Sequence, residues 1–280
     1  MLFIAPILGF MSPANPPAPS THAAPRPVVL VTGAARRVGR VIALELAAAG
    51  WDVAVHHRDS ADEARQTCAE LAAAGARALG FAVDLADAAA VRALVPQVVA
   101  AFGRLDALVN NASLFAHDDV ASFSADAAGQ HYQVNTVVPV LLAQALHTHV
   151  QARDARGCVV NLLDQKLWNP NPDYLSYTLS KAALREATTL LAQALAPSVR
   201  VVGVAPGVTL PSGPMSAAEF AAAHGLTPLG RSSTPQDVAE AVRYVLAAQA
   251  ITGTTLLVDG GQHLAAQARD VLYLARAQAG

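Results

Sequence analysis

Short, continuously apolar segments alternate with longer segments of helical periodicity between residues 28 and 261. Within the short segments, hydrophobic residues occupy successive positions instead of every second position. Strands of this kind are typical of a parallel sheet that is covered on both faces. The segments predicted to be strands are 28–33, 52–57, 78–85, 106–112, 158–164, 199–206 and 254–261.

The segments between these strands have the spacing of apolar residues expected of helices. Gly50, Gly75 and Gly103 each follow the last periodic residue, where glycine commonly ends a helix. Strands that alternate with helices predict an α/β fold, namely a single doubly wound Rossmann-type domain with a parallel sheet of about seven strands. The predicted helices are 37–49, 61–74, 88–102, 126–152, 174–195 and 235–248.

The first 26 residues differ from the rest of the chain. Residues 1–10 are apolar but lack the basic start of a secretory signal and the length of a membrane span. The Pro- and Ala-rich stretch that follows predicts a flexible tail over 1–26, before a domain over 27–280 that includes a C-terminal tail. Both Met1 and Met11 remain candidate start residues. The uncharged run 127–152 contains polar residues and predicts a buried helix, so we expect no membrane partner.

Composition narrows the class of protein. The 280 residues are 53% hydrophobic and 14% charged, which excludes a disordered chain and leaves room for a sizeable core. The net charge of −2 argues against a nucleic-acid-coating protein. Only two cysteines are present, Cys68 and Cys158, so we expect no disulfide framework and a reducing, cytoplasmic location. The nine histidines show no metal-ligand spacing, and no metal is expected.

The sequence TGAARRVG, residues 32–39, lies directly after the first predicted strand and opens the first predicted helix. Gly33 permits a tight turn there, and Gly39 permits close packing of helix and sheet. The free N–H groups of the helix N-terminus then offer a site for a pyrophosphate. The alternative is a turn of small residues that binds no ligand, but the context after a strand favours dinucleotide binding.

The end of the second predicted strand offers basic and hydroxyl groups. His57, Arg58 and Ser60 lie where a NAD-specific site usually carries an acidic residue for the ribose. A guanidinium beside a hydroxyl suits a 2′-phosphate, which favours NADP(H), although Asp59 counts against it. The alternative is a solvated loop in which Ser60 caps the helix that begins at Ala61.

Tyr177 and Lys181 are four residues apart and therefore share one face of a predicted helix. A tyrosine transfers protons poorly near neutral pH unless its pKa, normally about 10, is lowered. A neighbouring ammonium favours the phenolate, so we expect Lys181 to lower the pKa of Tyr177.

Taken together, these motifs resemble the short-chain dehydrogenase/reductase family over residues 27–265. The resemblance implies a proton relay of Asn135, Tyr177 and Lys181, and a nicotinamide that delivers hydride to a C=O, C=N or C=C bond. It also implies contacts of the adenine with Asp84 and Leu85. The other residues that it implies for the cofactor are Gly33, Arg36, Arg37, Val38, Gly39, His57, Arg58, Ser60, Asn111, Ala112, Tyr177, Lys181, Pro206, Gly207 and Thr209.

Two residues depart from the general family pattern. Arg37 replaces a glycine in the turn, and Asp164 replaces the catalytic serine thirteen residues before Tyr177. Both departures are similar to pteridine reductases, as is the segment NNASLF at 110–115. That resemblance implies an Asp–Tyr–Lys relay and an aromatic Phe115 that stacks a pterin against the nicotinamide. The alternative for Phe115 is an ordinary apolar loop residue.

Residues near these motifs are candidates for the substrate side. We predict that Ser113, Phe115, Asp164, Trp168 and Tyr177 bind substrate, with Tyr174 as a further wall of the cleft and core packing as an equal alternative for Trp168. Residues 210–220 are expected to form a mobile lid over the substrate. Residues 269–277 are expected to pack on a partner subunit of a homo-oligomer, a tetramer or a dimer.

Three functions follow as hypotheses. The first is an NADPH-dependent reductase of a pterin or a related flat heterocycle, of the dihydropteridine, dihydromonapterin or dihydrofolate type. The second is a short-chain carbonyl or 3-oxoacyl reductase that carries Asp164. The third is a dinucleotide-sensing protein without catalysis, which would have no need of the relay residues.

Overall fold

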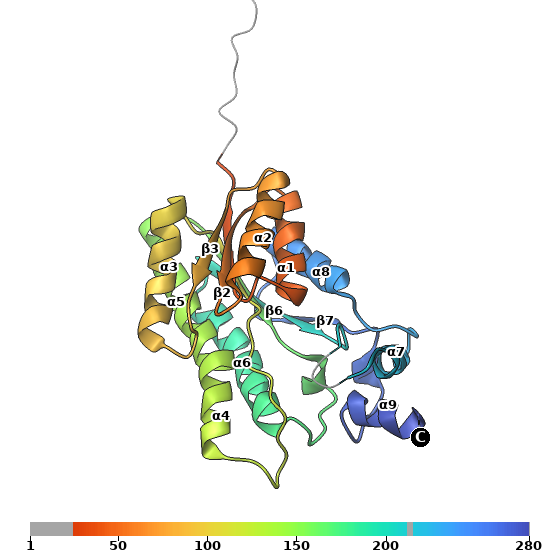
Figure 1. Ribbon diagram of the computed structural model, residues 1–280. Coiled ribbons are helices and arrows are strands. Elements are labelled where there is room, and N and C mark those ends of the chain that lie inside the picture. Colours follow the sequence, from red (N-terminus) through yellow and green to blue (C-terminus); the bar gives the residue numbers. More distant parts are fainter. Residues whose placement is uncertain (1–24, 212–214, 280) are drawn as a thin grey trace, which may run out of the picture.

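A seven-stranded, all-parallel sheet forms the centre of the computed structural model, which describes residues 25–211 and 215–279. The strand order is β3-β2-β1-β4-β5-β6-β7. This confirms the predicted fold class (Figure 1). The strands are β1 (Val28–Val31), β2 (Asp52–His57), β3 (Ala78–Ala82), β4 (Ala107–Asn110), β5 (Gly157–Leu162), β6 (Val199–Pro206) and β7 (Thr255–Val258).

Helices cover both faces of the sheet. One apolar cluster joins it to α1, α2 and α8, and a second joins the opposite face to α3, α5 and α6. The helices are α1 (Arg37–Ala48), α2 (Ala61–Ala73), α3 (Ala88–Phe102), α4 (Ala125–Tyr132), α5 (Val138–Ala152), α6 (Leu175–Ala194), α7 (Ala217–Gly225), α8 (Pro235–Ala247) and α9 (Val271–Ala279).

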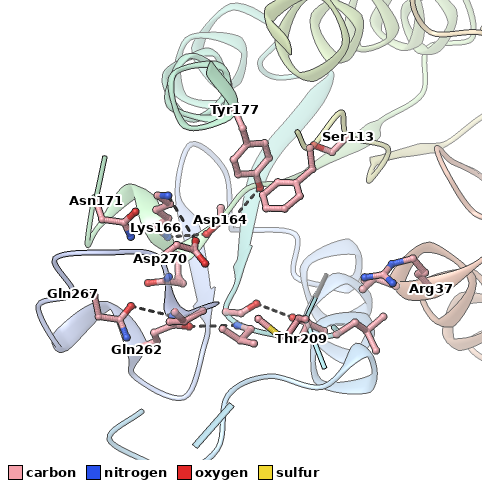
Figure 2. Close-up of a pocket in the computed structure, with 18 residues that line it drawn as sticks. Arg37, Ser113, Asp164, Lys166, Asn171, Tyr177, Thr209, Gln262, Gln267 and Asp270 are labelled. Atoms are coloured by element: carbon pink, nitrogen blue, oxygen red, sulfur yellow. Dashed lines mark hydrogen bonds and ion pairs between the residues drawn. The ribbon is translucent and has the colours of Figure 1, made fainter. Parts of the chain in front are cut away.

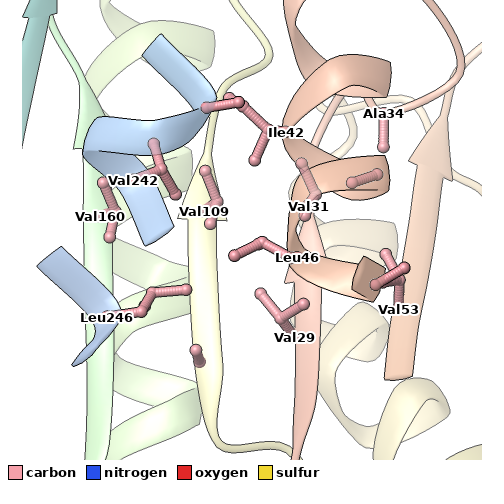
Figure 3. Close-up of a cluster of buried hydrophobic side chains, with 14 of the residues drawn as sticks. Val29, Val31, Ala34, Ile42, Leu46, Val53, Val109, Val160, Val242 and Leu246 are labelled. Atoms are coloured by element: carbon pink, nitrogen blue, oxygen red, sulfur yellow. The ribbon is translucent and has the colours of Figure 1, made fainter. Parts of the chain in front are cut away.

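The first strand shows why its sequence is continuously apolar. Val29 and Val31 pack with α1 and α8, among them Ile42 and Leu46 (Figure 3). Their neighbours in sequence, Val28 and Leu30, belong to the cluster on the opposite face. Because successive side chains of a strand point to opposite faces, a strand between two helical layers needs apolar residues at every position.

The order of the strands reverses at β1. This strand pairs with β2 on one side and with β4 on the other, and both pairings are parallel. A doubly wound sheet leaves a crevice at such a point, at the carboxyl ends of the strands, where ligands bind. The glycine-rich turn after β1 and the NNA segment after β4 meet at this edge.

The predicted helix 126–152 is interrupted. A π-helical turn, Gln133–Val137, separates α4 from α5 and contains Asn135. Single π turns inside helices are frequent at functional sites, but their wider hydrogen bonding leaves no signal in hydrophobic periodicity. The sequence therefore predicted one helix where the structure has three consecutive pieces.

The N-terminal tail was predicted over residues 1–26, of which residues 1–24 lie outside the described residues. Arg26, which we also assigned to the tail, is anchored, because its guanidinium donates hydrogen bonds to the carbonyls of Ala47, Gly50 and Gly75. It thereby holds the ends of α1 and α2 together.

At the other end, α9 packs within its own chain. Val271 and Ala275 form an apolar cluster with Ala223 of α7, and Arg276 is paired with Glu219 at 2.6 Å. Its apolar side is buried against α7, which the sequence did not predict as a helix. That this segment also packs on a partner subunit stays a prediction. No helix among residues 25–211 and 215–279 is long and apolar enough to cross a membrane.

Candidate active site

The glycine-rich turn has the backbone that its sequence predicts. Gly33 adopts a φ of +66°, and a Cβ on Gly39 would clash with the carbonyl oxygen of Gly33. Arg37 also lies in the left-handed region, with a φ of +54°, which explains why the general family pattern has glycine there. The residue before α1, Arg36, makes no side-chain cap, so the first amides of the helix remain available to an anion.

The segment after β4 is joined to this turn through Thr32. The Thr32 hydroxyl accepts hydrogen bonds from the amides of Asn111 and Ala112, at 2.9 and 3.0 Å. The Asn111 side chain donates to the Thr32 carbonyl at 2.8 Å. These contacts fix the two loops on either side of the crevice relative to each other.

His56, at the end of β2, supports the turn from below. Its Nδ1 accepts a 3.0 Å hydrogen bond from the Gly33 amide, so its Nε2 carries the proton and donates to the Val83 carbonyl at 3.0 Å. Burial lowers the pKa of His56 from 6.5 to about 4. From the sequence, His56 is only one of the polar groups at the end of the second predicted strand; its contact with the turn depends on the fold, which brings β2 beneath Gly33.

The other residues at this strand end differ in burial. His57 is buried, and its Nδ1 has no hydrogen-bond partner among the described residues. Arg58 is exposed, and its guanidinium donates a 2.6 Å hydrogen bond to the carboxylate of Asp59. The guanidinium is therefore already paired with its acidic neighbour. Ser60 precedes α2 without a side-chain hydrogen bond to it, so the alternative role of Ser60 as a helix cap was wrong. Leu85 is buried in the core, and Asp84 is exposed beside it.

Tyr177 and Asp164 face each other across the cavity wall. The Tyr177 hydroxyl donates a 2.8 Å hydrogen bond to Oδ2 of Asp164 (Figure 2). Asp164 follows β5, and its Oδ1 accepts from the Lys166 amide at 2.8 Å. Burial raises the pKa of Asp164, which brings its protonated form closer to neutral pH.

The predicted effect of Lys181 on Tyr177 was wrong for the protein without a ligand. Burial, together with the charge of Asp164, raises the pKa of Tyr177 well above 10. The Lys181 ammonium donates to the Leu162 carbonyl at 2.7 Å and lies 5.9 Å from the centre of the Tyr177 ring. Burial lowers the pKa of Lys181 to about 8. A carboxylate in contact with the hydroxyl thus outweighs the more distant ammonium.

Asn135 supports the substrate-side loop. It accepts hydrogen bonds from Ser113 Oγ and the Leu114 amide, and it donates to the Leu114 carbonyl and to Ser180 Oγ, all within 3.1 Å. The π turn therefore places an amide between α6 and the loop that carries Phe115. Asn135 makes no hydrogen bond to Tyr177 or Lys181 in the structure of the described residues.

A cavity of about 320 Å³ opens beside Tyr177 and Asp164 (Figure 2). Eight of the residues predicted for cofactor or substrate line it, from the start of α1, the segment after β4, the end of β5, helix α6 and the segment after β6. They are Arg37, Val38, Ser113, Phe115, Asp164, Tyr177, Gly207 and Thr209. The structure thus brings together the turn after β1, the NNA segment, the end of β5 and the segment after β6.

Phe115 is 41% exposed and forms part of an aromatic wall. Its ring stacks on Tyr174 with a centroid distance of 4.4 Å and an interplanar angle of 16°. It meets the Tyr177 ring edge-on at 4.7 Å. Tyr174 adopts a φ of +56° immediately before α6, which turns the chain so that its ring lies behind Phe115.

Trp168 is not part of the cavity wall, and its prediction as a substrate residue was wrong. It packs against the small apolar cluster of Leu163, Leu167 and Leu184, beneath the guanidinium of Arg185 at 5.7 Å. The short 3₁₀ turn Gln165–Leu167 rotates the chain after Asp164. Trp168 therefore points to the core, the alternative that we had weighed.

The segment after β6 is held by polar contacts. The Gly207 amide donates to the Val258 carbonyl at 3.1 Å, directly after Pro206, and the hydroxyls of Thr209 and Ser233 lie 2.8 Å apart. Residues 212–214 of the predicted lid 210–220 lie outside the described residues. Its end forms the start of α7, which Ser216 and Glu219 cap.

Several residues of the cavity wall were missed by the sequence analysis. Lys166 is buried, donates to the Asp173 carbonyl, and lies 3.8 Å from Asp270. Burial lowers its pKa. Other polar residues of the wall without a predicted role are Gln165, Asn171, Gln262, Gln267 and Asp270. Lys166 and Asn171 lie in the polar, Pro- and Asn-rich stretch 166–176 before α6, and three of the others come from the last quarter of the chain. No cluster of residues suited to a metal ion occurs in the described part of the chain.

Known proteins resemble this chain both in sequence and in structure. The model of a protein family described as short chain dehydrogenase matches residues 27–222. The chain belongs to this family. It is 36% identical to a putative ketoacyl reductase 2 of the granaticin polyketide synthase from Streptomyces violaceoruber, over 88% of this chain and 99% of the relative. It is 31% identical to the 3-oxoacyl-[acyl-carrier-protein] reductase FabG of Staphylococcus aureus, over 84% of this chain and 97% of the relative.

Solved structures add a second group of relatives within the family. The chain is similar to FolM alternative dihydrofolate reductase 1 from Brucella canis, crystallised with NADP. The identity is 40% and the TM-score is 0.81, with 87% of this chain and 97% of that chain covered. The FolM protein from Brucella suis, also in complex with NADP, gives 40% identity and a TM-score of 0.83 over 87% and 98%. These matches confirm the predicted family and its pteridine reductase-like subgroup.

Proposed function

We propose that this protein is an NADPH-dependent reductase that transfers hydride to a pterin or a related flat heterocycle. The observation that carries the proposal is the hydrogen bond from Tyr177 to Asp164 at the cavity, opposite the exposed ring of Phe115. A carboxylate accepts the amino and ring N–H groups of such a heterocycle and, when protonated, returns a proton to a ring nitrogen. A serine at the same place would chiefly donate to a carbonyl oxygen.

The residues around the first turn fit a dinucleotide. The uncapped N-terminus of α1 and the missing Cβ of Gly39 leave room and amides for a pyrophosphate. The buried, unpartnered Nδ1 of His57 and the Arg58 guanidinium suit a phosphorylated ribose. When bound there, NADPH supplies the hydride. The NADP complexes of the Brucella relatives support this cofactor for the present chain.

The chain's own residues then supply and hold the proton. Burial raises the pKa of Asp164, so this carboxylate takes up a proton more readily than an exposed aspartate does. Tyr177 is directed at its Oδ2, so a proton that leaves Asp164 is replaced from the tyrosine hydroxyl along a 2.8 Å hydrogen bond. The Lys181 ammonium beside the ring stabilises the phenolate that results. Phe115 offers a flat face on which a heterocycle stacks.

The second candidate is a 3-oxoacyl or other carbonyl reductase. The identity to the ketoacyl reductases of Streptomyces and Staphylococcus favours it. A dinucleotide sensor is disfavoured, because sensing needs no Tyr177 and Asp164 hydrogen-bonded at a cavity with the Lys181 ammonium beside the tyrosine ring. We further expect a cytoplasmic homo-oligomer, a dimer or a tetramer, as predicted from the sequence.

An NADPH oxidation assay separates the two enzymes. The purified protein is mixed with NADPH and, in parallel, with dihydrobiopterin, dihydromonapterin, dihydrofolate, a 3-oxoacyl thioester and simple ketones. Our proposal predicts the highest kcat/KM with one of the reduced pterins. Turnover confined to the thioester or the ketones would instead support the second candidate.

A further inference from the structure

The C-terminal segment, residues 262–276, forms one wall of the cavity. Gln262, Gln267, Asp270 and Val271 line the cavity opposite Arg37 and Val38. This wall lies entirely outside residues 27–222, the part of the chain that the family model matches.

Asp173 fastens the segment to the loop that follows Asp164. This carboxylate is 3% exposed and accepts 2.9 Å hydrogen bonds from both Nε and Nη2 of Arg269. It also accepts the Asp270 amide at 2.7 Å. A guanidinium that binds a buried carboxylate through two nitrogens fixes direction as well as distance. The positions of Arg269 and Asp270 are thus set by one side chain on the opposite loop.

Neighbouring contacts extend this attachment along the loop. Asn169 donates to the Ala265 carbonyl at 2.5 Å and accepts the Gln267 amide at 3.2 Å. The Lys166 ammonium pairs with Asp270 at 3.8 Å (Figure 2). Three residues of the 166–173 loop therefore hold two parts of the C-terminal segment, residues 265–267 and 269–270.

The same segment also reaches the aromatic wall. The Arg269 guanidinium lies 4.5 Å from the centre of the Tyr273 ring, and the Tyr273 hydroxyl hydrogen-bonds to His117 at 2.9 Å. His117 meets Tyr174 edge-on at 5.0 Å, and Tyr174 stacks on Phe115. The segment therefore connects the two loops that carry Asp164 and Phe115, and closes the cavity between them.

We propose that Asp173 and Arg269 are positioning residues that set the substrate-size limit of this site, by holding the C-terminal segment across the side of the cavity. The cavity of about 320 Å³ is at the lower end of the range for small-molecule sites, about 300–1,000 Å³. A flat head group with a short side chain fits such a volume. A substrate with a long tail has to displace the segment, and the Asp173–Arg269 pair opposes that displacement. This inference rests on the proposed reductase function for its choice of substrates.

The test compares a short and a long substrate in variants that release the segment. Arg269→Ala and Asp173→Asn are assayed with NADPH and either dihydrobiopterin, which has a short side chain, or dihydrofolate, which has an aromatic amide and a glutamate. We expect the ratio of kcat/KM for dihydrofolate to that for dihydrobiopterin to rise about tenfold, the scale of one lost charge-assisted hydrogen bond. The change should lie chiefly in the KM for dihydrofolate, and Arg269→Lys should return part of the original ratio.

Arg243→Ala is the matched control. Arg243 has the same 51% side-chain exposure as Arg269 and pairs with Glu45 at 2.7 Å, between α8 and α1, away from the cavity. It should leave the substrate ratio unchanged. Hydrogen exchange of residues 265–276, measured on the same proteins, should accelerate in Arg269→Ala and Asp173→Asn only.

Two results would overturn the proposal. Unchanged exchange in both variants would show that the pair does not hold the segment, and faster exchange with an unchanged substrate ratio would show that the segment does not limit size. If the wild-type protein reduces neither pterin, the proposed function is wrong, but the inference about the C-terminal segment can still be tested. The same ratio is then measured between short and long 3-oxoacyl thioesters, while the exchange experiment is read as before.

Discussion

The Tyr177 hydroxyl lies 2.8 Å from Oδ2 of Asp164 and donates to it, so an acid replaces the usual serine as the direct partner of the tyrosine. Burial and, after it, the negative charge of Asp164 both oppose formation of a phenolate, so they raise the pKa of Tyr177 and keep it protonated. The free protein therefore holds its transferable proton between two oxygens at the cavity. Protonation of Asp164 would remove its negative charge, and hydrogen bonds from a substrate's N–H groups would offset it. Either change would lower the pKa of Tyr177.

Asp164→Asn should separate chemistry from binding. We expect kcat with a reduced pterin to fall by about 10²–10⁴-fold, the usual effect of losing a general acid–base group. The asparagine keeps an oxygen for the Lys166 amide, so the 3₁₀ turn and the melting temperature should be preserved. NADPH affinity, measured by fluorescence titration, should not change. Asp164→Ser should favour simple carbonyls over pterins, whereas full turnover of a pterin by Asp164→Asn would leave only the broader reductase assignment.

Phe115→Ala should weaken use of the pterin far more than binding of the cofactor. The substitution removes a stacking face that contributes about 0.5–1.5 kcal/mol beyond burial. We expect a higher KM for the pterin and an unchanged Kd for NADPH. Phe123→Ala is the control, because Phe123 has a similar exposure of 43% and does not line the cavity. An equal loss of NADPH affinity in Phe115→Ala would mean that the ring only shapes its loop.

Arg58 and Asp59 should have opposite effects on cofactor choice. Arg58→Ala should raise the KM for NADPH and leave that for NADH nearly unchanged, because only NADPH carries the 2′-phosphate. Asp59→Asn should lower the KM for NADPH, since it frees the guanidinium from its 2.6 Å pair and removes a like charge from the phosphate. Steady-state kinetics with both cofactors tests this. Equal effects on NADH and NADPH would exclude Arg58 as a phosphate ligand.

His56 should make the stability of the fold depend on pH in acid. Its pKa is about 4 in the folded protein against an ordinary value of 6.5, so the unfolded chain binds the proton more readily between these values. The free energy of unfolding should therefore rise with pH from about 4 to 6.5, and fall as the pH is lowered through that window. This histidine's share is about 3 kcal/mol, because each pKa unit corresponds to about 1.4 kcal/mol.

Urea titrations across this pH range measure the effect. His56→Gln retains an acceptor and a donor without titrating, so the acid-dependent loss should be smaller in this variant than in the wild type. His147→Gln, on α5, is the control and should behave like the wild type. A wild-type pH dependence in His56→Gln would show that other groups cause the loss.

The sequence by itself determined the elements and the conserved part of the site. The hydrophobic pattern of a helix or strand is set by residues that are close in sequence, so it can be read without the fold. The ends of β2 and β6 were predicted to the residue, and all seven strands were predicted. The glycine-rich turn was equally readable, because Gly33 needs a positive φ and Gly39 allows no Cβ. The family pattern around Tyr177 was specific enough to single out Asp164 as its partner, since the two are only thirteen residues apart.

The tertiary structure decided what depends on contacts between distant residues. Asp173 and Arg269 are 96 residues apart, and no local pattern relates them. The role of His56 follows from the turn above it, and the core position of Trp168 follows from the rotation of the chain after Asp164. The pKa of Tyr177 was predicted in the wrong direction because helical spacing places Lys181 near the ring but does not reveal how deeply the hydroxyl is buried. This burial is the largest cause of the raised pKa. Burial is set by everything that surrounds a side chain, and only the folded chain contains that information.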